Sequence, residues 1–257
     1  MPPVIAEATR DRSGFLVHTV RSAMQDAPTK IKVLLPDRLE KERRYPVLFV
    51  LPVEAGDGSH FGDGLAEVKK LDLHNKHGLI CVLPTFAKLP WYADHPTDPK
   101  LRQETYFLDV VVPFVEKTYP AMAKPEGRLL LGFSKSGWGA FTLLLRHPDR
   151  FGRAAAWDAP LTMDAPGRYG SGAIFGDRDN FAKYHVLKLL ERQAGRLGDG
   201  KRLGLFGYGG FRKDHQTAHE EMIRLKVPHE YRDGPARKHD WHSGWVAEAV
   251  QFLAAPR

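Results

Sequence analysis

Residues 45–51 form an unbroken apolar run, and this run limits the fold more than any other feature of the sequence. Such a run is typical of a strand that is buried on both faces of a parallel sheet. Further apolar runs follow at residues 79–83, 128–133, 154–158 and 202–208, and helical patterns separate them. Strands that alternate with helices predict βαβ units with right-handed crossovers. We therefore expect an α/β fold with a mostly parallel central sheet that is flanked by helices.

The other expected elements complete this pattern. Two β-rich segments, residues 15–21 and 29–35, precede the apolar run and are expected to begin the sheet in antiparallel fashion. A short strand is expected at residues 229–232. Helices are expected at residues 65–77, 101–118, 137–146, 184–194, 214–225 and 244–253. Pro113 is expected to kink or break the second of these helices.

The length of 257 residues fits one α/β domain that spans residues 1–257, because compact α/β proteins often reach about 250 residues as one unit. Residues 161–200 follow the sixth strand, at the point where a cap over a pocket would be inserted. We interpret this segment as a small cap insertion, and a plain surface connection is the alternative.

The formal net charge is +7, but the basic residues are spread along the chain. The densest cluster, residues 41–44, is short and contains Glu42. Since no basic stripe or binding motif accompanies the charge, a nucleic-acid partner is not expected. We interpret the charge as a solvated basic surface that is mildly attractive to anionic substrates.

The sequence contains one cysteine, Cys81, so a disulfide within the chain is excluded. Cys81 lies in the apolar run at residues 79–83 and is expected to be a buried structural thiol. The first seven residues lack the apolar core of a signal peptide, and no stretch approaches the ~18 apolar residues of a membrane span. We therefore expect a cytoplasmic protein without a membrane partner.

Residues 128–140 read as a strand, a sharp turn and a helix, with Ser134 in the turn. A nucleophile elbow needs this context, because the turn lifts the hydroxyl above the sheet edge and requires small neighbours two positions away. Gly132 meets this requirement, whereas Ser136 is small but departs from the strict glycine pattern. The helix N-terminus favours negative charge, so the N–H of Lys135 is expected to be an oxyanion donor. An incidental serine in an ordinary turn is the alternative.

A serine hydroxyl needs a base to take its proton and a third group to orient that base. His239 follows the last expected strand and is the expected base, with His242 as its competitor. Asp214 is the first carboxylate after the strand at residues 202–208, so we expect it to be the acid. An N-cap of the next helix is another role that Asp214 could serve. Asp158, at the end of the preceding strand, is the alternative acid.

Several segments, in one order and with fitting spacing, resemble the esterase D-like esterases of the α/β-hydrolase superfamily, a group that includes the mycobacterial mycolyltransferases. These segments are residues 91–94, 104–108, 112–115, 129–137, 146–151, 227–231 and 239–241. The resemblance implies the α/β-hydrolase fold, with Ser134 as nucleophile and His239 as base. It implies Asp214 as the acid through the mycolyltransferase-like members, which carry the acid several residues after the seventh strand. Those members also lack the second elbow glycine, as this chain does at Ser136.

The resemblance further implies a second oxyanion donor directly after the apolar run, where many relatives have His-Gly and this chain has Pro52. Proline has no N–H, so by position the N–H of Glu54 is expected to donate, with Val53 next in line. A carboxylate that faced the site would oppose the developing negative charge. We therefore expect the Glu54 side chain to turn outward or to contact substrate.

Trp91, Tyr92 and Asp94 follow the strand at residues 79–83, on the side of the sheet where loops build a pocket. We interpret these residues as substrate contacts. Core packing of the two rings, together with a carboxylate that caps a turn, is the alternative.

Two pairs of histidines raise the question of a metal site. His215 and His219 share one helix face with Glu220 nearby, and His74 and His77 form a second pair. Neither pair has the H-E-x-x-H order, and a zinc site needs three or four converging ligands. The glycines at residues 207–210 lack the lysine of a phosphate loop. No metal and no cofactor are therefore expected.

These patterns together predict a serine esterase that hydrolyses a small-molecule carboxylic ester through an acyl-enzyme on Ser134 with a Ser–His–Asp triad. An acyltransferase that uses the same triad is one alternative, because the sequence does not separate transfer to an alcohol from transfer to water. A non-catalytic binding module on a hydrolase scaffold is the other, and the unusual segment at residues 52–54 is the feature that favours it.

Overall fold

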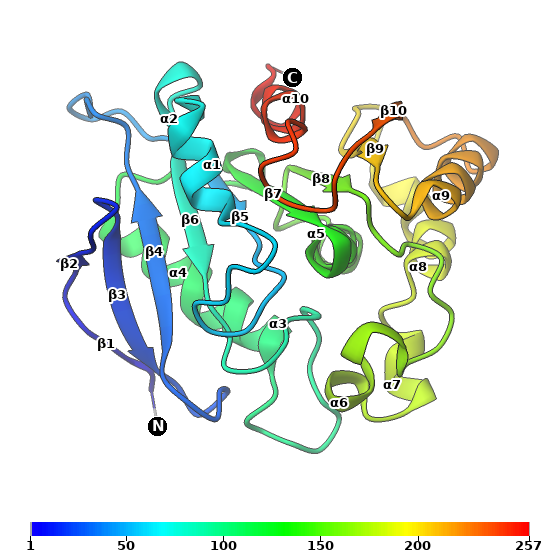
Figure 1. Cartoon of the computed structure of the whole chain (residues 1–257), viewed down its shortest axis with the longest axis horizontal. Helices are drawn as coiled ribbons and strands as arrows, with labels where there is room; N and C mark the ends of the chain where they lie inside the picture. The colour runs from blue at the N-terminus through cyan, green and yellow to red at the C-terminus, as the bar shows by residue number, and fades with distance from the viewer. Residues whose placement is uncertain (1, 257) are drawn as a thin grey trace.

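A twisted mixed sheet forms the centre of the computed structural model, which describes residues 2–256 (Figure 1). The strand order is β1-β3-β4-β6-β5-β7-β8-β9-β10, and β2 pairs with β3. The strands are β1 Val4–Ile5, β2 Thr9–Arg10, β3 Leu16–Arg21, β4 Thr29–Leu34, β5 Val47–Val50, β6 Ile80–Pro84, β7 Arg128–Phe133, β8 Arg153–Trp157, β9 Leu203–Tyr208 and β10 His229–Ala236. Met1 and Arg257, the two ends of the expected domain, lie outside the described residues.

Strand direction divides the sheet into two parts. The N-terminal strands pair in antiparallel fashion, up to the pairing of β4 with β6. From β6 to β10 every neighbouring pair is parallel. The apolar run at residues 45–51 contains β5, all four residues of which are buried. A mostly parallel sheet with an antiparallel start is the fold class that the sequence predicts, and this prediction is confirmed.

The two longest expected helices are interrupted. The first divides into α1 (Gly64–Lys70) and α2 (Leu73–Lys76), since Asp72 adopts a left-handed backbone with φ 58° between them. The second contains α3 (Gln103–Tyr106), a π-helical turn (Phe107–Val111) and α4 (Val112–Thr118). Pro113 lies just after the π-helical turn, and Val111 and Val112 keep helical backbone angles, so the chain continues in helical form through the proline.

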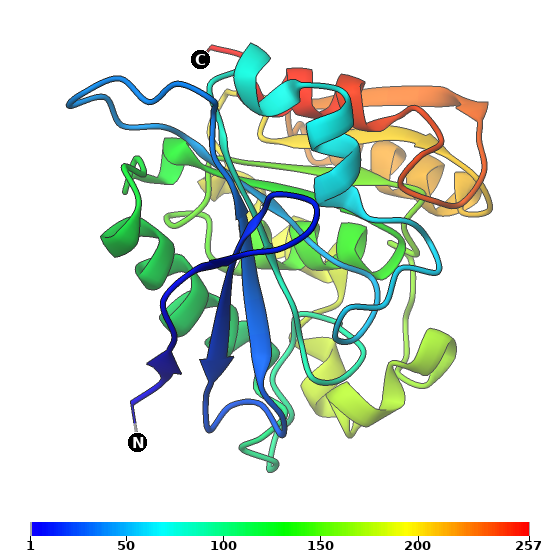
Figure 2. The same cartoon turned by 60° about the vertical axis from the view of Figure 1, so that its left-hand side comes forward.

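Helices cover both faces of the sheet (Figures 1 and 2). On one face, α1, α2 and α10 (Val246–Ala254) pack over a core that contains Leu65, Leu73 and Val250. On the other face, α4, α5 (Ser134–Arg146), α8 (Val186–Gln193) and α9 (Arg212–Arg224) pack over a second core. Two buried cores, one on each face, account for the apolar runs of the parallel strands.

Residues 161–200 fold into short helices, among them α6 (Gly172–Phe175), α7 (Arg178–Ala182) and α8. Rings of this segment pack against α5: Phe181 lies 5.5 Å and Phe175 lies 6.4 Å from Trp138 between ring centroids. The segment is therefore held against the helix that begins at Ser134. Its interpretation as a cap stays a prediction.

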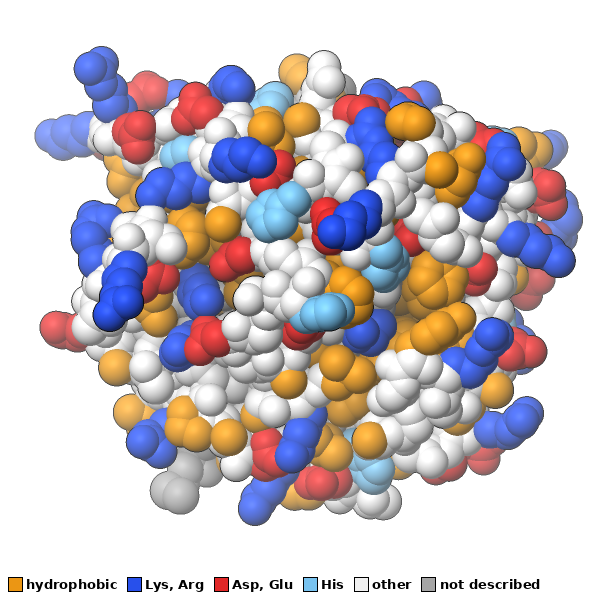
Figure 3. Space-filling model, in the orientation of Figure 1, with side chains coloured by type: hydrophobic (Ala, Val, Ile, Leu, Met, Phe, Trp, Pro, Cys, Tyr) orange, Lys and Arg blue, Asp and Glu red, His pale blue; other side chains and the backbone are white. Residues whose placement is uncertain are grey.

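The outer surface carries both signs of charge. On the face shown in Figure 3, blue basic side chains are interspersed with red acidic ones and form no continuous stripe. Of the helices formed by residues 2–256, none combines the length and the apolar character that crossing a bilayer requires. Cys81 is buried, and burial raises the pKa of its thiol.

Candidate active site

The carboxyl ends of the parallel strands bring the candidate residues to one edge of the sheet. Ser134 follows β7, Asp158 follows β8, and the segment with His239 follows β10. Residues 52–54 follow β5. This edge is where open α/β sheets bind their ligands, because loops from several strands converge there.

Ser134 occupies a strained turn between β7 and α5. Its φ is 51°, in the left-handed region that residues with a side chain rarely adopt. Two glycines make the turn fit: a Cβ at Gly132 would overlap the carbonyl of Ser136, and a Cβ at Gly137 would lie 2.8 Å from the Cβ of Ala159. The serine retains 8% of its exposed surface. This is the geometry that an elbow needs to present its hydroxyl.

Ser136 explains how the turn forms without a second elbow glycine. Its side chain is fully buried, and its Oγ accepts the N–H of Phe133 at 3.0 Å and donates to the Phe133 carbonyl at 2.9 Å. A buried hydroxyl with both a donor and an acceptor partner is satisfied. The Ser136 hydroxyl, which stands where the strict pattern has glycine, therefore stabilises the turn by its two hydrogen bonds to Phe133.

His239 pairs with Asp158. Its Nδ1 lies 2.5 Å from the Asp158 Oδ2 (short for such a pair), and its ring lies 5.1 Å from that of Phe133, the residue before Ser134. Since Asp158 accepts at Nδ1, the Nε2 of a neutral imidazole is left as the proton acceptor. The imidazole thus lies beside the turn that carries Ser134, with Nε2 as its basic nitrogen.

Asp158 is fully buried and ionised. Burial disfavours its charge, but hydrogen bonds from His239 and from the N–H groups of Gly210 and Phe211 outweigh burial and lower the pKa of the carboxyl. The two N–H donors lie 3.0 and 2.6 Å from its oxygens. An ionised carboxylate at this position would stabilise a protonated imidazole at His239.

Asp214 lies elsewhere, which corrects the expectation that it orients His239. Its Oδ1 accepts the N–H of Thr162 at 3.1 Å and the Thr162 hydroxyl at 2.6 Å. It lies in the first turn of α9, where Phe211 is the N-cap and no side chain caps the helix, and it ties that helix to the segment after β8. The carboxylate beside His239 belongs to Asp158, the alternative that the sequence left open.

His215, the residue after Asp214, binds the backbone next to Asp158. It is fully buried, and its Nε2 accepts the N–H of Ala159 at 2.8 Å, directly after Asp158. Burial lowers the pKa of His215 to about 4, so its ring is neutral at physiological pH. Within residues 2–256, no group of three or more His, Cys, Asp or Glu side chains could hold a metal ion.

His242, the competing base, has a different partner. Its Nδ1 lies 2.6 Å from Oε2 of the buried Glu67 in α1. The pair ties the loop that carries His239 to α1. The histidine beside the Asp158 carboxylate is therefore His239, whereas His242 pairs with Glu67.

The segment after β5 is fixed by two contacts. The Tyr92 hydroxyl donates to the Pro52 carbonyl at 2.6 Å, and the Glu54 Oε2 accepts the N–H of Phe61 at 3.2 Å. One carboxylate oxygen of Glu54 is therefore engaged by the following loop. The nearby ammonium group of Lys135 lies 5.9 Å from the Phe61 ring centre.

Trp91 and Tyr92 are packing residues, which corrects their interpretation as substrate contacts. Both side chains are fully buried, and Trp91 packs edge-on against Trp138 at 5.9 Å between centroids. A Cβ at Gly139 would overlap the Tyr92 ring, so the glycine makes room for it. Tyr92 contacts the segment after β5 through its hydrogen bond to the Pro52 carbonyl.

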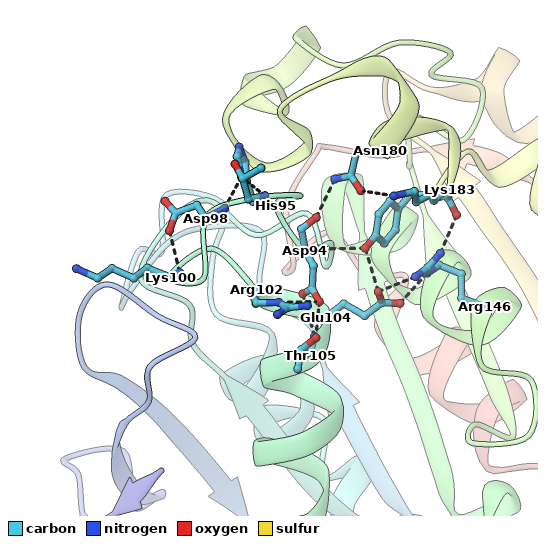
Figure 4. Close-up of polar contacts among 12 residues, drawn as sticks. Asp94, His95, Asp98, Lys100, Arg102, Glu104, Thr105, Arg146, Asn180 and Lys183 are labelled. Atoms are coloured by element: carbon cyan, nitrogen blue, oxygen red, sulfur yellow. Dashed lines mark hydrogen bonds and ion pairs between the residues drawn. The ribbon is translucent and has the colours of Figure 1, made fainter. Parts of the chain in front are cut away.

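Asp94 is also engaged within the protein (Figure 4). Its Oδ1 accepts the Thr105 N–H at 3.0 Å, its Oδ2 meets the Thr105 hydroxyl, and Arg102 lies 3.5 Å away. Its backbone N–H and carbonyl bind Tyr184 and Asn180 of the segment 161–200. Asp94 thus joins α3 to that segment, and its expected contact with substrate stays a prediction.

Glu104 is the centre of the same network (Figure 4). The buried carboxylate accepts two hydrogen bonds from Arg146, at 2.7 and 2.9 Å, one from Tyr184 at 3.0 Å and lies 2.7 Å from the His147 Nε2. Burial raises its pKa, but His147 and Arg146 outweigh burial and lower the pKa to about 2. The network therefore joins α3, α5 and the segment 161–200 through one charge.

Glu104→Gln is expected to lower the free energy of unfolding by about 3 kcal/mol at pH 7. A depressed carboxyl pKa stabilises the fold fully above about pH 4.5, its ordinary value, and this contribution is lost as the pH falls towards 2. The difference between wild type and variant should therefore shrink between pH 5 and pH 2. Urea unfolding at several pH values measures it.

The matched control is Asp149→Asn, since Asp149 is 81% exposed and pairs with Arg196 at the surface. Its effect should stay below about 1 kcal/mol at every pH. A difference between wild type and Glu104→Gln that does not change with pH would contradict the assigned role of the Glu104 charge.

The chain resembles known proteins in sequence and in fold. Residues 22–166 match the sequence family described as "Putative esterase". The protein of Mycobacterium tuberculosis named esterase Rv1288 is 26% identical over 137 residues, which are 52% of this chain and 29% of that protein. The match therefore covers less than a third of the length of the curated relatives.

Two solved structures share the fold. A ferulic acid esterase superposes with a TM-score of 0.73 at 22% identity, over 93% of this chain and 96% of the other. The fluorophosphonate-binding serine hydrolase F of Staphylococcus aureus, FphF, superposes with a TM-score of 0.75 at 17% identity, over 94% and 98% of the two chains. At these identities the likeness concerns the arrangement of the elements.

Proposed function

The chain belongs to the esterase family that residues 22–166 match, a family of serine hydrolases that cleave carboxylic esters, and on that premise we propose that Ser134, His239 and Asp158 are its catalytic triad. The observation that carries the proposal is the pairing of His239 Nδ1 with the buried Asp158 carboxylate, over the strained turn of Ser134. The chain order Ser, acid, His fits α/β-hydrolases.

In the proposed reaction, the Ser134 Oγ attacks the ester carbonyl while His239 takes its proton at Nε2. The C–O bond to the alcohol then breaks, and His239 returns the proton to the leaving oxygen. Water attacks the acyl-enzyme by the same route, with His239 as base, and releases the acid and free Ser134. Asp158 stays ionised throughout and stabilises the imidazolium.

The N–H groups of Lys135 and Glu54 are proposed to bind the oxyanion, with Val53 as the alternative second donor. A donor of this kind is typically worth ~3 kcal/mol in the transition state. The position of Lys135 in the first turn of α5 supports its role, because helix N-termini favour negative charge. The anchoring of Pro52 by Tyr92 supports a fixed position for the second donor.

Residues 161–200 are proposed to form a fixed cap beside this site. Two contacts support this proposal: the packing of Phe181 on Trp138, and the binding of Tyr184 to Glu104. Tyr169, which is 45% exposed, packs edge-on against Phe211, whose ring lies 6.0 Å from that of His239. The segment thereby contributes an aromatic rim next to the base.

An activity-based probe tests the proposed nucleophile. A fluorophosphonate should react with native protein, add one phosphonyl group to the intact mass, and map to the peptide that contains Ser134. Heat-unfolded protein should stay unlabelled, because the reaction depends on His239 and the oxyanion donors. Native protein that resists labelling, or labelling at another serine, would overturn the assignment.

A further inference from the structure

The side chain of Lys135 is half-buried directly beside the proposed nucleophile. Its Nζ lies 5.9 Å from the centre of the Phe61 ring. That ring packs edge-on against the His239 imidazole, with 5.6 Å between centroids. The ammonium group and the base therefore share one aromatic neighbour.

The charge of Lys135 is incompletely compensated by the protein. Burial lowers the pKa of its amine, and the carboxylate of Glu54 acts in the opposite direction by favouring the ammonium form. Among residues 2–256, no carboxylate forms a direct ion pair with Lys135, and Glu54 binds the N–H of Phe61. A partly buried cation without a direct counter-charge gains when an anion binds beside it.

The position of His239 indicates which part of a substrate would meet this cation. His239 must return its proton to the leaving oxygen, so the alcohol part of the ester lies next to its ring. Phe61 contacts that ring, and Lys135 lies over Phe61. An alcohol part bound there would therefore lie close to Phe61, the ring that Lys135 also contacts.

We propose that Lys135 is a specificity-determining residue whose ammonium group binds an anionic substituent on the alcohol part of the ester. This inference rests on the proposed function and adds the substrate class to it. A carboxylate or a phosphate would form a charge-assisted hydrogen bond there, within a partly desolvated site. The net charge of +7 acts in the same direction, because it raises the local concentration of anionic substrates.

Two matched pairs of esters test the proposal. In the first pair, 4-carboxyphenyl butyrate and 4-carbamoylphenyl butyrate differ by a charge on the alcohol part. In the second, monoethyl adipate and its monoamide differ by a charge on the acyl part. Values of kcat/KM are measured for wild type, Lys135→Met and Lys135→Arg, all of which keep the backbone N–H of residue 135.

Wild type should prefer the charged member of the first pair. Lys135→Met should reduce that preference by about 10- to 100-fold, with the rate for the uncharged ester serving as the internal reference within each variant. Lys135→Arg should retain the preference, since it keeps the charge. Lys238→Met is the matched control, because Lys238 precedes His239 and its side chain is 88% exposed, and it should also retain the preference.

An equal preference in wild type and Lys135→Met overturns the proposal, and so does an equal loss in Lys238→Met. A loss confined to the adipate pair overturns the assignment to the alcohol part. Calorimetric titration of Ser134→Ala, with and without Lys135→Met, repeats the comparison as binding, and equal affinities for both members overturn it too. Failure of the proposed function is recognised separately, since Ser134→Ala would then still hydrolyse the uncharged butyrate.

Discussion

Ser134→Ala is expected to lower kcat for a short aryl ester by about 10⁶-fold, the scale on which a serine hydrolase responds to loss of its nucleophile. Without the hydroxyl at the turn between β7 and α5, no acyl-enzyme can form. The oxyanion donors and His239 remain, so a small residual rate above that of water should persist. Initial rates of p-nitrophenyl butyrate hydrolysis measure the effect.

The control for this prediction lies in the same turn. Ser136→Gly restores the strict elbow pattern and removes the two hydrogen bonds of Ser136 with Phe133. It should cost about 1–3 kcal/mol of stability but keep hydrolysis within about tenfold of wild type. Retention of hydrolysis by Ser134→Ala, in protein purified free of host esterases, would refute the nucleophile.

Asp158→Asn is expected to lower kcat by about 10⁴-fold, whereas Asp214→Asn should change it by no more than a few-fold. An amide at position 158 removes the charge that stabilises the imidazolium and favours the wrong tautomer of His239. An amide at position 214 disturbs only the bonds to Thr162, which should cost about 1–2 kcal/mol of stability.

The pair of variants is self-controlling, because both replace one aspartate near the same sheet edge by its neutral isostere. Circular dichroism and thermal unfolding establish that each variant is folded before rates are compared. A collapse of activity in Asp214→Asn alone would return the acid to the position first expected from the sequence. Loss in both variants to the same degree would argue for an indirect effect through α9.

Much of the fold could be predicted because its strongest signals are local. The buried strands β5, β6 and β7 are read from short apolar runs, since burial on both faces leaves no polar alternation. The turn at Ser134 is also local, because Gly132 and the residues after it fix its shape. The break at Asp72 was not predictable, because an aspartate in a left-handed conformation has no clear sequence signature.

The acid could not be chosen from the sequence, for a physical reason. Asp158 and Asp214 both follow strands that end at the same edge, so their order along the chain does not separate them. The choice depends on how far the turn after β9 extends, because the N–H groups of Gly210 and Phe211 reach the Asp158 carboxylate. Gly209 lies where this turn meets Asp158, because a Cβ at Gly209 would lie 2.7 Å from the Asp158 Oδ2.

The prediction that Trp91 and Tyr92 contact substrate was wrong for a related reason. Aromatic residues in a loop after a strand are equally suited to lining a pocket and to filling a core. The choice between pocket and core depends on residues that are distant in the sequence. Trp91 packs against Trp138 of α5, and Tyr92 fits against Gly139 because glycine has no side chain. Such pairings arise only when the helix and the loop have packed together.

The pairing of β7 with β8 has a consequence for how this chain can vary in evolution. Phe133 and Trp157 form the last paired positions, so Ser134 and Asp158 leave the two strands side by side. The N–H of Ser134 donates to the Asp158 carbonyl at 3.1 Å. Their spacing is therefore set by strand register and is independent of the length of chain between them. Insertions in the connection from α5 to β8 can accumulate without changing the distance between nucleophile and acid.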